Sequence, residues 1–354
     1  MNNHFNVKKA VAIISIASAF FLIGCQTDSR ITYLNLRPAG DEILGYIEEF
    51  EAFSFGAEMG IAHSFGVTAE NFEFGSTDDF YGVIEISDTT NKLVAQIGSI
   101  STHDFYLILK VFVNYEEVSF RVHGEDAYAT EFVFFLERGY QVDIPFTIDS
   151  RYLEEDAIYK LTAGVFVDPH RDVINEDNLD FFWGRTGMAL NNDLILGFGN
   201  NIEFETPPYH ELIYRRKDDQ FVDLFIAPEF ELNEYGVLPP PPLNIQARRG
   251  EEIELLFYAS PLAALGYELE NYLIIGMLDW QQTHLSGHPF LFIDASESEF
   301  DYILDHGMLT LNAIDEVGIY DFIAILIPNP SHPNSLTNSV PLRTSNRLVI
   351  EIIE

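Results

Sequence analysis

Two kinds of residue are scarce in this sequence: cysteine, of which there is one, and the basic residues. Its 354 residues include 19 Lys and Arg against 56 Asp and Glu, which gives a formal net charge of −37 at pH 7. A surface of that sign repels phosphate backbones, so nucleic acid is not an expected partner. Because Cys25 has no second cysteine to pair with, the folded part is expected to depend on its hydrophobic core alone.

The short motifs of common catalytic sites are also missing. No Gly-x-Ser-x-Gly, Ser-x-x-Lys or phosphate-binding glycine loop occurs. His284 and His288 have the spacing of two metal ligands on one helix face, but the Ser-Gly between them and the Pro after them favour a polar loop. The acidic cluster at 175–180 does not follow the spacing of a calcium loop. We therefore expect a non-enzyme with no catalytic residue, no metal and no cofactor.

The N-terminus has the composition of a secretory signal. Two lysines precede a run of apolar and small residues at 10–24, which is too short to span a bilayer. The run ends in Leu-Ile-Gly-Cys at 22–25, the branched, small and cysteine order of a lipobox. In these residues the chain resembles the secreted bacterial lipoproteins.

The resemblance implies that residues 1–24 are a cleaved signal peptide and that Cys25 becomes the first mature residue. It also implies a diacylglyceryl group on the Cys25 sulfur and a further acyl chain on the new amine. Each buried methylene contributes about 0.8 kcal/mol, so two or three chains hold a protein on a bilayer. We expect residues 25–40 to form a lipidated tether at the cell membrane or the outer membrane, on the extracytoplasmic side.

From Phe80 onward, apolar runs rich in Val, Ile, Phe and Tyr alternate with clusters of Gly, Asp, Asn and Pro, a pattern typical of β-strands. Residues 41–75 follow neither the helical nor the strand period, and we expect strands with loops there and one short helix near 42–50. The strands expected in the first half are Tyr81 to Ile86, Leu93 to Ile97, Phe105 to Val113, Val118 to Val122, Glu131 to Leu136, Gln141 to Ile148, Ile158 to Val167 and Met188 to Phe198.

The second half of the sequence repeats the first. Ile158 to Pro169 has a counterpart in Ile319 to Pro330, and each is followed by a loop and a closing strand. We expect a first domain at 41–205 with an N-terminal extension and a second at 221–354. The segment 206–220, with two prolines and the basic Arg-Arg-Lys triplet, is expected to be a linker.

Each repeat has a tyrosine, Tyr159 or Tyr320, ahead of a long strand that ends in Asp-Pro or Asn-Pro. This arrangement resembles the tyrosine corner of immunoglobulin-like and fibronectin-like sandwiches. The resemblance implies an all-β fold of two tandem immunoglobulin-like Greek-key β-sandwiches after a lipoprotein signal peptide. A jelly roll or another Greek-key sandwich is the alternative.

One loop combines side chains that often grip a ligand. Asp180, Phe182, Trp183 and Arg185 place aromatic rings beside a carboxylate and a guanidinium, as in sites that hold a sugar face or a protein hot spot. The alternative is that these rings cover an open end of the sandwich. Trp280, at the end of an expected strand, is a second candidate for an exposed ligand-binding ring.

These observations favour a membrane-anchored, surface-exposed lipoprotein that acts as a binding or adhesion-type module through its sandwich loops. A surface glycan or an envelope protein is the expected partner, in addition to the membrane held by the lipid on Cys25. The first alternative is a non-catalytic structural subunit of a cell-envelope assembly. A secreted hydrolase is the second.

Overall fold

The computed structural model describes residues 35–38, 62–69, 83–86, 92–100, 105–137, 140–167, 187–196, 200–201, 206–217, 224–228, 244–261, 268–296, 303–331 and 342–354. Residues 35–354 form one compact unit. Almost all regular structure in the described ranges is β-strand, and they contain no helix long and apolar enough to cross a membrane. Cys25, the tether and the expected helix near 42–50 lie outside these ranges.

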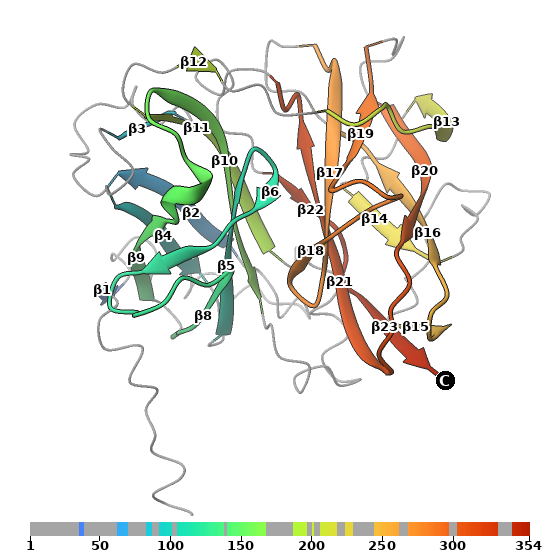
Figure 1. Ribbon diagram of the computed structural model, residues 1–354, viewed down its shortest axis with the longest axis horizontal. Helices are drawn as coiled ribbons and strands as arrows, with labels where there is room; N and C mark the ends of the chain where they lie inside the picture. Colours follow the sequence, from blue (N-terminus) through green and yellow to red (C-terminus); the bar gives the residue numbers. More distant parts are fainter. Residues whose placement is uncertain are drawn as a thin grey trace, which may run out of the picture. The chain divides into compact units, whose positions relative to one another are not determined.

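The first sandwich consists of two sheets (Figure 1). One has the order β1-β9-β4-β2 with β7 added to β9, and the other has the order β3-β11-β10-β5-β6 with β8 added to β5 and β12 to β10. The bounds are β1 Asn35–Pro38, β2 Ala62–Ala69, β3 Val83–Ile86, β4 Leu93–Ile100, β5 Phe105–Val113, β6 Glu116–Glu117, β7 Phe120–Val122, β8 Glu131–Leu136, β9 Tyr140–Ile148, β10 Ala157–Val167, β11 Gly187–Leu196 and β12 Asn200–Asn201, with a 3-10 turn η2 at Ser150–Tyr152.

The second sandwich repeats this plan. Its sheets have the orders β13-β20-β16-β14 and β15-β23-β21-β17-β18, with β19 added to β17 and β22 to β21. The bounds are β13 Leu212–Lys217, β14 Leu224–Ala227, β15 Asn244–Arg248, β16 Ile253–Ala259, β17 Asn271–Leu278, β18 Gln281–Thr283, β19 Leu291–Asp294, β20 Ile303–Leu311, β21 Gly318–Pro328, β22 Arg343–Thr344 and β23 Leu348–Ile353.

Strand order identifies both halves as immunoglobulin-like. In that fold, strands A, B and E share one sheet while C, F and G share the other. The strands β2, β4 and β9 take the first set of places and β5, β10 and β11 the second, and β14, β16, β20 and β17, β21, β23 do the same. In each half a short strand, β3 or β15, also pairs in parallel with the last strand. The predicted fold class is therefore confirmed, and the main strands of the two halves follow the same order.

Both tyrosine corners have the expected hydrogen bond to a backbone group just upstream. Tyr159, at the start of β10, accepts a hydrogen bond at its hydroxyl from the Glu154 N–H at 2.5 Å. Tyr320, at the matching place in β21, donates its hydroxyl to the Glu316 carbonyl at 2.9 Å. The hydroxyl thus fixes the loop that enters the third strand of the sheet in both repeats.

The segment expected as a linker is largely part of the second sandwich. Tyr209 bridges Phe292 of β19 with its ring stacked on the Phe292 ring at 5.0 Å, and the His210 N–H donates to the Phe292 carbonyl at 2.7 Å. Residues Leu212–Lys217 then form β13, the edge strand beside β20. The chain therefore adds to the edges of both sheets before it enters the second core.

Arg215, the first residue of the basic triplet in this segment, has a structural role that its sequence did not reveal. Arg215 donates from Nε and Nη2 to the two carboxylate oxygens of Asp305 at 2.6 and 2.8 Å. Asp305 is fully buried and also accepts the Tyr272 hydroxyl at 2.8 Å. Burial raises the pKa of Tyr272 well above its ordinary value, because removal from water disfavours the phenolate and Asp305 adds a negative charge nearby. This network fastens β13 to the core.

Candidate binding site at the junction of the sandwiches

Two matching hairpin turns project from the facing sheets of the two sandwiches. The β5–β6 turn consists of Asn114 and Tyr115, with φ of 49° and 69°, and the β17–β18 turn consists of Asp279 and Trp280, with φ of 47° and 64°. Positive φ at both central residues is the type I′ turn that suits the twist of a two-residue hairpin. Asn and Asp are well suited to the first position, so each turn presents an aromatic ring at the second.

The neighbouring long strand holds each turn in the same way. The Asn114 N–H donates to the Lys160 carbonyl at 2.7 Å, and its Oδ1 accepts from the Lys160 N–H at 2.9 Å. In the second sandwich, the Asp279 N–H donates to the Asp321 carbonyl at 2.7 Å, and its Oδ1 accepts from the Asp321 N–H at 3.0 Å. The repeat therefore extends to the hydrogen bonds of individual turn residues.

The rings on these turns belong to a hydrophobic cluster that joins the two sandwiches. Every residue of β17 except the last is buried, so both faces of that strand are covered. One face lies in the second core and the other packs on the first sandwich. The cluster between the sandwiches contains Ile108, Phe112, Tyr115 and Phe166 from the first, and Leu273, Ile275, Met277, Trp280, Phe290, Phe292, Ile323, Ile325, Ile327 and Leu342 from the second.

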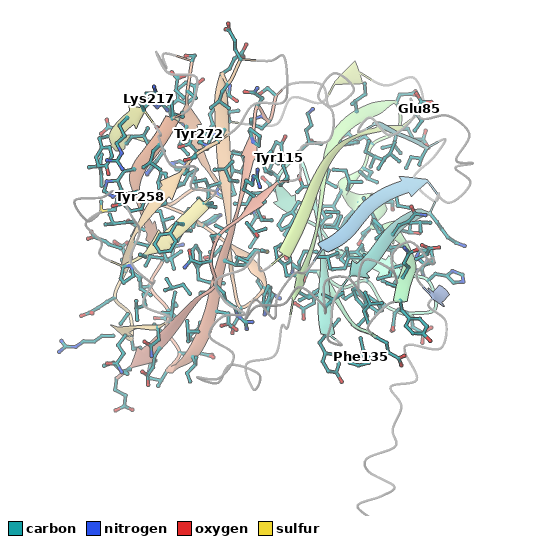
Figure 2. The ribbon with its side chains drawn as sticks, turned by 180° about the vertical axis from the view of Figure 1, so that it is seen from behind. Glu85, Tyr115, Phe135, Lys217, Tyr258 and Tyr272 are labelled. Carbon is teal, nitrogen blue, oxygen red and sulfur yellow. The ribbon has the colours of Figure 1, made fainter. Side chains whose placement is uncertain are left out.

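Each turn ring makes specific contacts in this cluster. Tyr115 is fully buried, and its hydroxyl donates to the Pro330 carbonyl of the second sandwich at 2.7 Å. Figure 2 shows Tyr115 where the two halves meet. Trp280 packs against Phe166 of the first sandwich at 5.8 Å between ring centroids, and the Arg347 Cζ lies 5.3 Å from the centroid of the Trp280 ring. Each sandwich thus places the ring of its turn in contact with the other sandwich.

Polar contacts close the junction beside the rings. The Glu117 N–H donates to the Gln282 Oε1 at 2.7 Å, and Gln282 Nε2 donates to the Tyr115 carbonyl at 2.8 Å. Glu117 and Gln282 occupy the same position in the two repeats, so equivalent residues face each other. Such reciprocal contacts are those of an isologous dimer interface, here within one chain.

A buried ion pair lies on the first sandwich's side of the junction. The Lys110 side chain is completely buried, and its Nζ pairs with a Glu117 carboxylate oxygen. Burial lowers the pKa of Lys110 because the ammonium loses its water, and the nearby Glu117 charge opposes this only in part. The second sandwich has Ile275 in the place of Lys110 and Gln282 in that of Glu117, so it contains no such pair.

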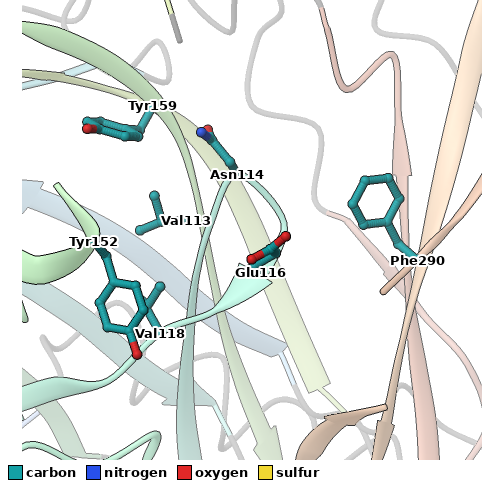
Figure 3. A pocket seen from close by; sticks show the side chains of 7 residues that line it. All are labelled: Val113, Asn114, Glu116, Val118, Tyr152, Tyr159 and Phe290. Carbon is teal, nitrogen blue, oxygen red and sulfur yellow. The ribbon is translucent and has the colours of Figure 1, made fainter. Parts of the chain in front are cut away.

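A pocket of about 260 Å³ lies beside the β5–β6 turn, between the two sandwiches. In Figure 3, the two tyrosines and the two valines lie on one side, Phe290 of the second sandwich lies on the other, and Asn114 and Glu116 lie between them. The lining residues are Val113, Asn114, Glu116, Val118, Tyr152, Tyr159 and Phe290.

The pocket's one carboxylate is available to a ligand. Glu116 is exposed, and among the described residues its carboxylate has no hydrogen-bonding or ionic partner. A cation lies beside one wall of the pocket. The Arg151 guanidinium lies over the Tyr152 ring at 4.7 Å and donates to the Tyr152 hydroxyl at 2.7 Å. Arg151 is paired with Asp149 at 3.2 Å, which balances its charge. The pocket therefore combines aromatic walls with an unpaired negative charge.

Most of the ligand-binding residues expected from the sequence cannot be compared with this site. Asp180, Phe182, Trp183 and Arg185 lie outside the described residues. Trp280 was expected to be exposed, and this expectation is wrong: the ring is 7% exposed, because it packs between Phe166 and Arg347 at the junction. Its burial there makes it part of the interface between the sandwiches.

The histidine pair and the acids show no metal geometry in the described part of the chain. His284 and His288 flank a tight turn in which Leu285 bridges His288, with Ser286 and Gly287 at positive φ. They therefore lie in a loop, as expected, and not on one helix face. Among the described residues, no group of three or more His, Cys, Asp or Glu is arranged to hold a metal ion.

Comparison with known proteins identifies no family. No family model matches the chain, and no curated protein matches it. Among solved structures, the C-terminal domain of the Streptococcus agalactiae AgI/II polypeptide BspA aligns with 81% of this chain and 100% of its own length, at 11% identity and a TM-score of 0.23.

Two further solved structures align equally loosely. The C-terminal domain of the Streptococcus pyogenes antigen I/II-family protein AspA aligns with 82% of this chain and 99% of its own length, at 10% identity and a TM-score of 0.19. A red sea bream transglutaminase aligns with 90% of this chain and 34% of its own length, at 8% identity and a TM-score of 0.21. Scores this low carry no argument about function, and the fold assignment stands on the strand order.

Proposed function

We propose that this chain is a membrane-anchored, surface-exposed bacterial lipoprotein that acts as a binding module, with the junction pocket as a binding site. The observation that carries the proposal is the pocket itself, where the unpaired Glu116 carboxylate stands among aromatic side chains. Concave sites with a few placed polar groups and apolar walls are the usual form of ligand sites. The lipobox supports the anchor, and the loop at 180–185 remains a second proposed contact region.

The junction makes this pocket suitable for recognition because its walls are fixed. Phe290 comes from the second sandwich and the other lining residues from the first, and the buried cluster and the Tyr115 hydrogen bond hold the two together. A pocket that is already formed loses less conformational entropy on binding. A lone carboxylate also suits recognition better than hydrolysis of a glycoside, which needs a second acid or base.

The anchor is tested with Cys25→Ser, since the serine hydroxyl does not receive the diacylglyceryl group. We expect the wild-type chain in the membrane fraction of an expressing bacterium, labelled by an alkyne analogue of palmitate, and the variant unlabelled and released. Thr27→Ala, two residues beyond the lipobox, is the matched control and should behave as wild type. Labelling of Cys25→Ser would disprove the anchor at this position.

Binding is tested with the purified lipid-free chain on polysaccharide columns and by co-purification of the full chain with envelope proteins. Glu116→Gln copies the residue at the matching position of the second sandwich, Gln281, so it should fold normally. We expect it to lose retention or co-purification, while Glu254→Gln, an exposed acid on β16, should not. Retention unaffected by Glu116→Gln and Tyr152→Ala would overturn the pocket. Co-purification at fixed stoichiometry that ignores both variants would favour the structural-subunit alternative.

A further inference from the structure

We infer that the junction pocket binds a primary ammonium group, an inference that rests on the proposed binding function and names its ligand chemistry. Three observations point to a cation: the unpaired Glu116 carboxylate, the aromatic rings around it and the size of the space. Each of them restricts the class of ligand in a different way.

The carboxylate sets the sign of the ligand's charge. Glu116 has no partner among the described residues, whereas the neighbouring acids Glu117 and Asp149 are paired with Lys110 and Arg151. Glu116 is therefore the pocket's uncompensated charge. The formal net charge of −37 strengthens the preference, because the field of the whole chain attracts cations and repels anions. Phosphates, uronic acids and carboxylates are disfavoured on this basis.

The aromatic walls favour an ammonium over a bare metal cation. Tyr152, Tyr159 and Phe290 line the pocket with rings, and the electron-rich face of an aromatic ring attracts an organic cation. Metal cations instead require several converging oxygens, and the pocket offers one carboxylate. The Asn114 Oδ1 accepts the Lys160 N–H, which holds this side chain in place and leaves one lone pair on the oxygen for an ammonium proton.

The volume limits the size of the bound group. About 260 Å³ lies below the roughly 300 to 1,000 Å³ of drug-sized sites. It suits one side chain or one small ring, not an extended polymer segment. The ammonium could be supplied by a lysine side chain of an envelope protein or by an amino sugar at the end of a glycan, and these two sources share the chemistry that the pocket recognises.

The test measures binding of two matched pairs of probes to the purified chain by saturation-transfer NMR and calorimetry. The first pair is Nα-acetyl-lysine amide, which keeps its side-chain ammonium, and its uncharged analogue Nα-acetyl-norleucine amide. The second is methyl glucosaminide and methyl N-acetylglucosaminide. We expect at least one charged probe to bind at least tenfold more tightly than its uncharged partner, with an affinity that falls as salt screens the Glu116 charge. The pair that shows the larger ratio identifies the source of the ammonium.

Variants decide whether the binding is at this pocket. Glu116→Gln should weaken the charged probe at least tenfold and leave the uncharged one unchanged, and Tyr152→Leu should weaken it severalfold. Glu254→Gln is the control for loss of one negative charge elsewhere and should have no effect. Equal binding of charged and uncharged probes, or binding insensitive to Glu116→Gln, would overturn the inference.

The outcome also separates this inference from the proposed function. Envelope material retained by the wild type and lost with Glu116→Gln, together with no binding of either amine, would leave a binding module whose ligand is of another class. Loss of both results would remove the pocket as a site altogether.

Discussion

The two sandwiches have the same strand order but fill matching buried positions differently. Ile148 pairs with Phe120 and Leu311 pairs with Leu285, at matching places after the two turns, and counting back equally from each puts Val142 where the second sandwich has Asp305. Leu107 of β5 and Tyr272 of β17 likewise lie equally far before Tyr115 and Trp280. The first core is thus apolar where the second has an ionic network. The difference teaches that the fold itself requires only apolar side chains there, and that the charged group serves to capture Arg215 of the entering chain.

The largest expected effect comes from breaking that network alone. Asp305→Val should lower the free energy of unfolding by about 3–5 kcal/mol, because it leaves the buried Tyr272 hydroxyl without its acceptor and the Arg215 guanidinium with the Asp294 carbonyl but no carboxylate. Denaturant unfolding followed by circular dichroism measures the loss. The triple variant Asp305→Val, Tyr272→Leu, Arg215→Met copies the apolar pattern of the first sandwich and should recover most of it. A single variant as stable as wild type would contradict the assigned role.

The junction is tested next, by removing the buried ring that the second sandwich contributes. Trp280→Ala should cost about 3 kcal/mol, since it opens a cavity beside Phe166 in the cluster between the sandwiches. Calorimetry should change from one transition to two as the sandwiches uncouple. Tyr128→Ala removes a ring that is 41% exposed and should do neither. Two transitions in the wild type would show that the halves are already independent.

A smaller effect is expected from the ion pair that only the first sandwich has. Lys110→Ile should cost about 2 kcal/mol, because the partly buried Glu117 carboxylate loses its partner. Adding Glu117→Gln copies Ile275 and Gln282 of the second sandwich and should bring stability back to within about 1 kcal/mol of wild type. Chemical denaturation of the three chains makes the comparison. A double variant less stable than Lys110→Ile would show that the pair itself is needed.

The same pair predicts a dependence on pH. The folded pKa of Lys110 is lowered from its ordinary value of 10.5, so between the lowered pKa and 10.5 the unfolded chain binds more protons than the folded one. Stability contributed by this group therefore rises with pH across that window. Titrated against the double variant, the wild type should gain relative stability as the solution becomes alkaline. A constant difference would argue against a buried ammonium.

The smallest effect is expected at the tyrosine corners. Tyr320→Phe removes a hydrogen bond to the Glu316 carbonyl in an exposed setting and should cost about 1 kcal/mol or less. Tyr159→Phe should cost slightly more, because the Glu154 N–H loses its acceptor in a more buried place. Matched unfolding curves test the order. A larger loss at Tyr320 would reverse the comparison.

Much of the fold could be predicted from the hydrophobic periodicity of the sequence. The expected strands Phe105 to Val113 and Glu131 to Leu136 coincide with β5 and β8, since alternation and flanking turn residues were both clear there. The junction was harder to predict. The unbroken apolar run of β17 is typical of a strand covered on both faces, but a run of this kind does not say what covers it, and the junction was not predicted from the sequence.

The site depended on features that a sequence reports poorly. Type I′ turns are usually recognised from Asn-Gly, and here Tyr115 and Trp280 occupy the glycine position, so neither turn was predicted. Without the turn, Trp280 at a strand end appeared exposed. The pocket also needs Tyr152 and Phe290, which are 138 residues apart by their numbers and share no motif. Only the arrangement of the two sandwiches brings them together.

The strand that precedes the second core defines where the second sandwich begins in the sequence. Tyr209, His210 and β13 pair with β19 and β20, so they belong to the half that follows them and not to the half they leave. A transferable module would thus begin before Tyr209. A recombination that cut at residue 221 would give a second sandwich that lacks the edge strand β13 and in which the buried Asp305 has lost Arg215. We expect such a product to be unstable.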